Sequence, residues 1–458
     1  MSSTLDLRPG AGAGPPVPAA CGVSTESALV VARREGVPAH DLPPELRNGP
    51  VRIADLEKAA GDGVEARLAV QLQLAALSDA QMITFAAGSG ADCLADLRPM
   101  APGFRLASLP LGRIVMSRFA HLRAEDGALV AATPLSVATI RLLGSSAASV
   151  LGVLASGADA ASLIEHSDRP GEMRAFIELL VSAAIVSPAS DGGTADVDET
   201  PALRHWEFHD LLFHARSRIG RHDANIGGSY RFAGQLDPPP CVAEREVALT
   251  TSLTPPSRPL PLDRGLVSAL SRRTSVREYG QLPITVRELG DFLYHSARVV
   301  DFVPGPGGPF TRRPYPSGGA SYELEVYPVV DRCVGLDAGL YYYDAVAHGL
   351  ARLAAPNADT EALLNDAYIA SGQTCRPQVL LAIASRFQRV SWKYEGIAYA
   401  TTLRNVGALY ATMYLVATAM GLAPCALGAG DSGRFSRLAG TDPYTESTVG
   451  EFMIGSAP

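Results

Sequence analysis

Lysine is nearly absent from this sequence. Of its 458 residues, 39 are lysine or arginine, but only Lys58 and Lys393 are lysines, which leaves 39 − 2 = 37 arginines. Positive charge is therefore supplied by arginine almost everywhere. Because arginine cannot replace a lysine that has to lose its proton, a lysine retained within a motif of this chain indicates that its proton matters there.

Close cysteine pairs, an excess of positive charge and a signal peptide are also missing. The six cysteines, at 21, 93, 241, 333, 375 and 425, form no CxxC pair. Neither a zinc site nor a redox motif is indicated, and free thiols in a reducing cytosol are expected. The net charge of −8 argues against a nucleic-acid partner, and the N-terminus has no apolar core. The sequence therefore predicts a cytoplasmic protein that binds no nucleic acid.

Two further patterns lead to neither a membrane span nor a metal site. The run from Asn405 to Gly430 has no charge, but its small residues and Pro424 favour a buried core helix over a membrane span. His205 and His209 are four residues apart, as two metal ligands on one helix can be. No third ligand is evident near them, so packing or capping roles are expected and no metal is predicted.

Composition and periodicity divide the chain into five segments. They are a disordered tail rich in Gly, Pro and Ala, a degenerate winged-helix-like module, a second winged-helix-like module, a linker with a helix, and an α+β domain. Their expected bounds are 1–20, 21–104, 105–190, 191–262 and 263–458. The linker is rich in Pro and Gly, which favours extended chain at the surface.

The module at 105–190 has the element order of a winged helix. Strand-like alternation over residues 113–123, a turn at Glu125-Asp126-Gly127 and the apolar run at 128–132 predict a hairpin. Three short helices and a closing strand are expected at 146–155, 159–166, 171–183 and 185–186. The third helix carries two acids and one base, whereas a helix in the major groove needs the opposite balance. The module is therefore predicted to bind a peptide or a protein. A helix at 64–77 and a strand at 82–86 suggest the degenerate copy.

Strands and helices alternate from residue 267 onward, which is typical of an α+β domain. Strands are predicted at 324–330, 340–343 and 379–384, and the last is an uninterrupted apolar run typical of a buried strand. A long helix is predicted from Leu403 to Met420, with Gly421 as its stop signal.

Two motifs in this domain favour a flat ligand that carries a phosphate. In residues 272–277, Arg273 and Arg277 are four apart with hydroxyls between them, so they can clamp one phosphate. The alternative is a solvated basic turn. In residues 313–320, two glycines before a strand let the backbone approach a flat ligand, and Ser317 can reach its polar edge. The alternative is a tight turn entering the strand.

The run Trp392-Lys393-Tyr394-Glu395 holds one of the two lysines. A lysine beside a tyrosine, just before a buried helix, predicts an acid/base pair. The alternative is a surface lysine lying over an aromatic ring. The scarcity of lysine elsewhere favours the acid/base interpretation, because arginine would serve the alternative equally well.

Residues 428–433 match the dinucleotide motif GxGxxG in form only. The motif requires a βαβ unit with an acid about 20 residues further on. Since 458 − 433 = 25 residues remain, a nicotinamide-binding domain of this type is excluded. A glycine-rich loop lying against a cofactor is the interpretation that remains.

Taken in order, these motifs resemble the nitroreductase-like flavoenzymes, and more narrowly the SagB-type (ThcOx-like) azoline dehydrogenases that act on ribosomally made peptides. The resemblance runs from about Arg118 to the C-terminus. Its motifs are Arg118-Phe119-Ala120, Trp206-Glu207, Phe213-His214, Ser217-Arg218, Arg273 to Arg277, Pro316 to Gly319, Gly339-Leu340-Tyr341, Lys393-Tyr394 and Ala419 to Leu422.

The resemblance implies a fold, a reaction and a set of site residues. The fold is an antiparallel-rich sheet flanked by helices, with FMN bound between the two subunits of a homodimer. The reaction is the oxidation of thiazoline or oxazoline rings to thiazole or oxazole in a precursor peptide, with oxygen reoxidising the flavin. Lys393 and Tyr394 are the implied catalytic pair, which removes the ring proton while hydride passes to the flavin. The residues implied to bind FMN are Arg273, Thr274, Ser275, Arg277, Pro316, Ser317, Gly318, Gly319, Leu427, Gly428 and Ala429.

Partners follow from the same resemblance. Winged-helix modules before the flavin domain resemble leader-peptide binding elements, and a cyclodehydratase is the implied partner enzyme. One family feature is missing, because relatives carry a basic residue near the C-terminus that helps to hold the phosphate. Arg434 or Arg437 is the expected substitute.

Two alternative functions stay open. One is an NAD(P)H-dependent reductase of small nitroaromatics or quinones, against which the large N-terminal half argues. The other is a non-catalytic, peptide-binding subunit of a modification complex, against which Lys393 argues. The ring type also stays open, as does another two-electron oxidation of a peptide, such as Cα–Cβ desaturation.

Overall fold

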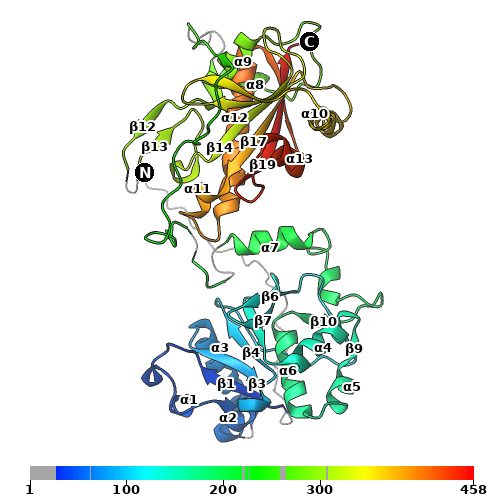
Figure 1. The fold of residues 1–458 in the computed structure, drawn as a ribbon. Helices are drawn as coiled ribbons and strands as arrows, with labels where there is room; N and C mark the ends of the chain where they lie inside the picture. The colour runs from blue at the N-terminus through cyan, green and yellow to red at the C-terminus, as the bar shows by residue number, and fades with distance from the viewer. Residues whose placement is uncertain (1–26, 62, 219–221, 226, 258–264, 306–307) are drawn as a thin grey trace, which may run out of the picture. The chain divides into compact units, whose positions relative to one another are not determined.

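The computed structural model describes residues 27–458 except 62, 219–221, 226, 258–264 and 306–307. The chain forms two compact units, divided between Ala224 and Asn225 (Figure 1). The predicted disordered tail at 1–20 lies outside the described residues. The division falls inside the predicted linker at 191–262, so that the two ends of this linker belong to different units.

The N-terminal unit is built on a seven-stranded antiparallel sheet with the order β2-β1-β3-β4-β8-β7-β6. A smaller antiparallel sheet has the order β10-β5-β9. The strands are β1 Leu29–Arg33, β2 Val51–Arg52, β3 Ile83–Ala87, β4 Ala95–Pro99, β5 Arg113–Met116, β6 His121–Glu125, β7 Ala128–Ala132, β8 Ala138–Leu142, β9 Ala158–Asp159 and β10 Val186–Pro188.

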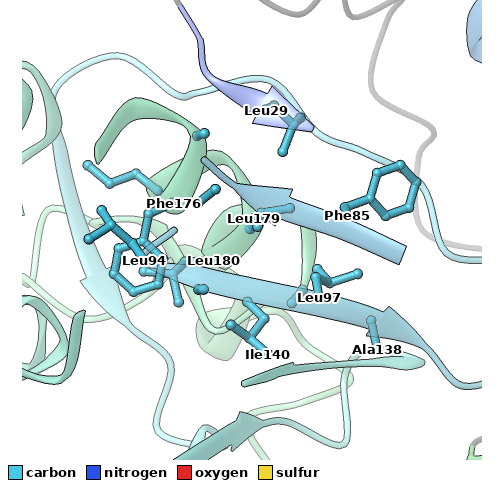
Figure 2. Close-up of a cluster of buried hydrophobic side chains, with 14 of the residues drawn as sticks. Leu29, Phe85, Leu94, Leu97, Ala138, Ile140, Phe176, Leu179 and Leu180 are labelled. Atoms are coloured by element: carbon cyan, nitrogen blue, oxygen red, sulfur yellow. The ribbon is translucent and has the colours of Figure 1, made fainter. Parts of the chain in front are cut away.

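Helices cover this sheet and close its core. The helices are α1 Pro44–Arg47, α2 Ile53–Ala60, α3 Val64–Asp79, α4 Ser145–Ala155, α5 Ala160–Glu165, α6 Pro170–Ser182 and α7 Phe208–Arg216, with 3-10 turns at Ala39–Asp41, Gly90–Asp92 and Asp196–Glu199. Figure 2 shows Phe176, Leu179 and Leu180 of α6 among side chains from the strands, such as Leu97. Burial of these apolar side chains holds α6 on the sheet.

The elements predicted for residues 105–190 are confirmed except for the alternating run at 113–123, which a turn at 118–119 divides into β5 and β6, strands of two different sheets. The hairpin turns at Asp126 and Gly127, whose φ angles are 49° and 76°, as a tight hairpin turn requires. Three helices and a closing strand follow as expected, and α3 and β3 confirm the upstream pair. However, strands from 29–99 and from 121–142 share one sheet and one core. The assignment of this unit as two winged-helix-like modules, divided at 104/105, stays a prediction.

The C-terminal unit is built on a second seven-stranded antiparallel sheet with the order β11-β16-β15-β14-β17-β19-β18. Its strands are β11 Thr251–Ser252, β14 Leu324–Val330, β15 Gly339–Asp344, β16 Gly349–Ala354, β17 Val379–Arg386, β18 Leu422–Leu427 and β19 Glu446–Ser456, and β12 Asp301–Val303 pairs separately with β13 Phe310–Arg312. Its helices are α8 Leu266–Arg272, α9 Val286–Ala297, α10 Ala358–Ala370, α11 Phe387–Ser391, α12 Ala398–Met420 and α13 Ser432–Ala439, with a 3-10 turn at Gly318–Ala320.

Both faces of this sheet are buried, which explains the apolar run in β17. Leu381 and Ile383 pack in one core with side chains of α9 and α12, whereas Leu380 and Ala382 pack in a second core with α10 and α13. Successive side chains of a strand point to opposite faces. A strand buried on both faces therefore has no polar alternation. The predicted α+β class, the antiparallel sheet and the three predicted strands are confirmed.

The uncharged run from Asn405 to Gly430 forms two elements. The helix α12 ends at Met420, and Gly421 takes φ 73° as its left-handed cap, as predicted. The rest of the run returns as β18, in which Pro424 lies at the edge of the sheet. Within the described parts of the chain, none of the helices combines the length and the apolar character that a membrane span needs.

Candidate functional site

Lys393 and Tyr394 lie in a short connection between two helices of the C-terminal unit. β17 leads directly into α11, and the chain turns there before α12 begins. The backbone N–H groups of Lys393 and Tyr394 both donate to the carbonyl oxygen of Val390, at 3.2 and 2.8 Å. This turn places Lys393 and Tyr394 just after α11, the short helix that follows β17.

The loop from Pro316 to Gly319 precedes β14 and continues into a strained turn that ends at Tyr322. Gly319, Ala320 and Tyr322 have φ angles of 60°, 53° and 45°, and the left-handed region costs a residue other than glycine about 1–2 kcal/mol. Ser317 holds this shape, since its carbonyl oxygen accepts from Ala320 N at 3.1 Å and its Oγ accepts from Tyr322 N at 3.0 Å. Strain that the surroundings maintain is concentrated at functional sites.

The structure brings this loop and the Lys393-Tyr394 pair together. Lys393 Nζ donates to the carbonyl oxygen of Gly319 at 3.2 Å. A Cβ atom on Gly319 would lie 2.6 Å from Nζ and closer still to the hydroxyl oxygen of Tyr394. The rings of Tyr230, Phe310 and Tyr394 have their centroids 5.7, 5.9 and 5.3 Å from Nζ. No carboxylate among the described residues lies within ion-pair distance of Lys393. The amine of Lys393 and the phenol of Tyr394 thus both lie beside Gly319, and both are groups that can act as general acids or bases.

Two buried side chains, Asn405 and Glu323, hold the loop from Pro316 to Gly319 through hydrogen bonds. Gly318 N donates to Asn405 Oδ1 at 2.9 Å, and Asn405 Nδ2 donates to Glu323 Oε1 at 2.9 Å. Ser317 Oγ donates to the other carboxyl oxygen of Glu323, at 3.4 Å. Burial raises the pKa of Glu323, while the hydrogen bonds from Asn405 and Ser317 act to lower it. Because both oxygens of Glu323 are bound, the loop keeps one position relative to α12.

The segment predicted to bind phosphate, residues 273–277, contacts the second half of α12. Ser275 Oγ is 2.7 Å from the hydroxyl oxygen of Tyr414, which also accepts from Ala426 N at 2.8 Å. The guanidinium carbon of Arg273 lies 5.2 Å from the centre of the Tyr414 ring. Tyr414 therefore ties this segment to both α12 and β18.

The cations of this segment are available to an anion. Arg273, Thr274 and Arg277 are exposed, and in the described structure neither arginine has a carboxylate within ion-pair distance. Arg376, in contrast, pairs with both Asp331 and Glu361. Two guanidinium groups without acidic partners, beside hydroxyl groups, fit a phosphate dianion.

Leu427, Gly428 and Ala429 lie at the end of β18. Leu427 is buried and pairs with Glu451 of β19, whereas Gly428 and Ala429 are exposed. A Cβ atom on Gly428 would have no other atom within 4 Å. The backbone at Gly428 is thus open to a ligand. β18 and β19 are antiparallel, which agrees with the exclusion of a βαβ nucleotide motif.

The predicted site residues form groups along α12. Asn405, in the first half of the helix, holds Gly318, and Tyr414, in the second half, holds Ser275. Among the described residues, no hydrogen bond or ring contact joins the segment at 273–277 to the pair at 393–394. The structure therefore unites Gly319 with Lys393 and Tyr394, and separately unites Ser275 with β18.

Arg434 and Arg437, which were expected to help hold the phosphate, are paired with carboxylates instead. Arg434 lies 3.3 Å from a carboxyl oxygen of Asp359 and 3.3 Å from one of Asp431. Arg437 lies 4.0 Å from Asp359. Because these carboxylates already neutralise both cations, the geometry does not support a phosphate role for either arginine.

Several residues of the site were not predicted from the sequence. They are Tyr230, Phe310, Glu323, Asn405 and Tyr414. Glu323 directly precedes a predicted strand, and Asn405 begins the uncharged run of a predicted core helix. Both therefore carried a weak signal as buried polar residues that need partners. Tyr230 and Phe310 reach the site from outside all of the predicted motifs, and only the tertiary structure locates them.

Comparison with known proteins assigns the two units to different family models. The cyanobactin oxidase ThcOx model matches residues 114–223, and the nitroreductase family model matches residues 270–456. The chain is 31% identical over 167 residues to the Methanocaldococcus jannaschii protein "Putative nitroreductase MJ1384", which covers 36% of this chain and 78% of that protein.

Two further relatives are processing proteins. The trifolitoxin-processing protein TfxB of Rhizobium leguminosarum bv. trifolii is 27% identical over 150 residues, 32% of this chain and 40% of that protein. The microcin B17-processing protein McbC of Escherichia coli is 32% identical over 126 residues, 26% of this chain and 44% of that protein. The solved E. coli microcin synthetase McbBCD complex with truncated pro-MccB17 bound matches at 20% identity and a TM-score of 0.34, over 55% of this chain and 92% of that one. With a ThcOx-type segment before its nitroreductase domain, the chain belongs to the nitroreductase family.

Proposed function

We propose that this protein is an FMN-dependent oxidase of thiazoline or oxazoline rings in a ribosomally made precursor peptide. It would remove two hydrogen atoms from each ring and so form a thiazole or an oxazole, with O2 as the final electron acceptor. The position of both Lys393 Nζ and the Tyr394 hydroxyl beside Gly319 is the observation that carries this proposal. The similarity to two processing proteins and to the ThcOx model supports the peptide substrate.

Lys393 and Tyr394 would handle the proton of the reaction. Lys393 Nζ would take the proton that leaves the ring carbon, and the Tyr394 hydroxyl, which also lies beside Gly319, would assist the transfer. The carbonyl oxygen of Gly319 orients Nζ while the ring is bound. Arginine could keep the charge here but not the exchange of the proton.

The residues proposed to hold FMN fit a phosphate-bearing, planar cofactor. Arg273, Thr274, Ser275 and Arg277 would bind the phosphate end, because the two arginines have no acidic partner in the described structure. Pro316, Ser317, Gly318 and Gly319, with Leu427, Gly428 and Ala429, would lie along the ring system. When bound, FMN would accept one hydride, which carries both electrons of the oxidation, while the second hydrogen leaves the ring as a proton.

Partners and location belong to the same proposal. We infer a homodimer, with a second subunit completing the flavin site, and a cyclodehydratase that supplies the ring. The module at 105–190, acidic in its third helix, would bind the leader peptide. The protein would act in the cytoplasm, without nucleic acid or membrane.

Flavin content and the mass of a treated peptide test the proposal. The purified protein should be yellow, and a precursor peptide that already contains azolines should lose two hydrogen atoms per ring in air. A protein that neither contains FMN nor takes it up would contradict the cofactor. Rapid bleaching of the flavin by NAD(P)H without peptide would favour the small-molecule reductase. An unchanged peptide mass, despite binding, would favour a scaffold.

A further inference from the structure

The segment from Gly227 to Ser252 lies between the two family models, which end at 223 and begin at 270. It nevertheless pairs with the connection that carries the catalytic lysine. Gly227 forms a β-bridge with Glu395, and Tyr230 N donates to the carbonyl oxygen of Lys393 at 3.2 Å. The backbone on one side of Lys393 is thus held by residues outside the nitroreductase match.

The rest of this segment is attached to the same unit. Trp392 Nε1 donates to the carbonyl oxygen of Leu236 at 2.9 Å, and Arg389 donates to that of Pro239 at 2.8 Å. Further along, Arg245 binds the carboxylate of Glu446. Attachment at several points along its length makes the 227–252 segment a structural part of the C-terminal unit, and this holds Tyr230 in place.

Tyr230 borders a pocket at Lys393. The pocket is lined by Tyr230, Pro238, Phe310, Arg389, Trp392 and Lys393, among others. The Tyr230 ring meets the Trp392 ring edge-on, with centroids 5.8 Å apart and planes at 84°. Phe310 reaches the pocket from the β12–β13 hairpin. The Tyr230 side chain is 44% exposed, although the segment that carries it is anchored on both sides.

A pocket of this composition suits one kind of ligand. Aromatic side chains bind flat rings through stacked or edge-on contacts. The side-chain nitrogen Nζ of Lys393 is 5.7 Å from the centre of the Tyr230 ring and 5.9 Å from that of Phe310. A small planar ring held by these two side chains would therefore lie beside the group that takes its proton.

We propose that Tyr230, with Phe310, forms a ring-binding wall that holds the five-membered heterocycle of the substrate beside Lys393. This inference rests on the proposed function for the identity of the ring. Tyr230 contacts the substrate through the face of its ring, and its hydroxyl group is not required. The wall selects a modified residue over an unmodified one, because an unmodified cysteine or serine offers no flat face to stack on.

A binding experiment tests the wall without relying on turnover. The sequence has only two tryptophans, Trp206 and Trp392, so a Trp206→Phe background leaves Trp392, at the pocket, as the reporter. The protein is titrated with a short peptide that carries one thiazole, and with the same peptide carrying an intact cysteine. Dissociation constants are read from the Trp392 fluorescence of the flavin-loaded protein.

The variants separate the ring of Tyr230 from its hydroxyl group. Tyr230→Ala should weaken binding of the thiazole peptide about tenfold, equal to about 1.4 kcal/mol, and leave binding of the cysteine peptide unchanged. Tyr230→Phe should bind both peptides as the parent does. Phe310→Leu should also weaken only the thiazole peptide. Tyr444→Ala, which removes a tyrosine that is 85% exposed and does not line the pocket, is the control and should change neither constant.

Each of three results would overturn the proposed ring-binding wall. These results are equal binding of the two peptides by the parent, unchanged binding of the thiazole peptide by Tyr230→Ala, and a Tyr230→Phe variant as weak as Tyr230→Ala. Loss of folding in Tyr230→Ala would appear as loss of flavin, and Tyr230→Phe and Phe310→Leu would then decide. If the parent binds the thiazole peptide through Tyr230 but never oxidises an azoline, the proposed function fails and the wall stands.

Discussion

The side-chain nitrogen of Lys393 lies 3.2 Å from the carbonyl oxygen of Gly319. Gly319 follows Gly318, whose backbone N–H is bound by Asn405, and Asn405 in turn donates to Glu323. The position of the amine thus depends on a backbone atom whose own position is fixed by buried hydrogen bonds. The following predictions test what this arrangement does.

Replacing Lys393 by arginine should abolish turnover and spare the cofactor. Arginine keeps the positive charge but cannot release its proton, and loss of general acid–base catalysis costs about 10²–10⁴-fold in rate. We expect kcat to fall within that range and the flavin absorbance per protein to stay unchanged. Lys58→Arg is the matched control, because it alters the other lysine, which is exposed and lies in the N-terminal unit. A fully active Lys393→Arg would remove the acid/base role.

A methyl group on Gly319 should disturb Lys393 and Tyr394, the proposed catalytic pair. Its Cβ would meet Lys393 Nζ and the Tyr394 hydroxyl, and its φ of 60° would be strained. Gly440→Ala is the matched control, since Gly440 has φ 66° but no atom within 4 Å of the added Cβ. Both variants should lose about 1 kcal/mol of unfolding free energy, the cost of the left-handed region. Only Gly319→Ala should also lose turnover, by tenfold or more, measured on protein of equal flavin content. Equal activity of the two variants would mean that contact at Gly319 is immaterial.

Arg273 should contribute to flavin affinity, and Arg437 should not. A charge-assisted hydrogen bond is worth about 1.5–3 kcal/mol, so Arg273→Ala should weaken FMN binding by about one to two orders of magnitude. Arg437 lies beside Asp359 instead, and Arg437→Ala should leave FMN affinity unchanged. Fluorescence titration of the apoprotein with FMN measures both. If Arg437→Ala were the weaker binder, the phosphate would have to lie at α13.

His348 should make the C-terminal unit sensitive to mild acid. Burial, together with the nearby guanidinium of Arg298, lowers the pKa of His348 to about 4, whereas an unfolded histidine titrates near about 6.5. Between these values the unfolded chain binds a proton that the folded chain does not, so stability is present above about pH 6.5 and is lost as the pH falls towards about 4. The loss should be about 1–3 kcal/mol.

Unfolding in denaturant, followed by Trp392 fluorescence in the Trp206→Phe background, measures this loss. His348→Asn should reduce the dependence on pH, and asparagine is chosen because His348 has φ 49°, which asparagine tolerates. Some dependence should remain, because burial also lowers the pKa of His295. His166→Asn, an exposed histidine in the other unit, should leave the pH dependence as it is. An unchanged dependence in His348→Asn would assign the effect to other groups.

Local patterns in the sequence determined most of the elements and one half of the site. The three predicted strands and the helix ending at Gly421 required only apolar periodicity and a stop residue, which act over a few neighbouring positions. The scarcity of lysine pointed to Lys393 before any fold was known. The proposed roles of the eleven cofactor residues and of Lys393 and Tyr394 stay predictions, since only a ligand or an assay can test them.

The tertiary structure decided which distant segments of the chain come into contact at the candidate site. The contact of Gly319 with Lys393, the support of Gly318 by Asn405 and the approach of Tyr230 and Phe310 each join segments between about 70 and 160 residues apart. The tertiary structure also turned the end of an uncharged run into strand β18, and joined strands of two predicted modules in one sheet. Such pairings depend on burial and hydrogen bonding between distant segments. No local pattern carries that information, so the sequence alone indicated the residues proposed to react, and only the fold showed the surroundings in which they lie.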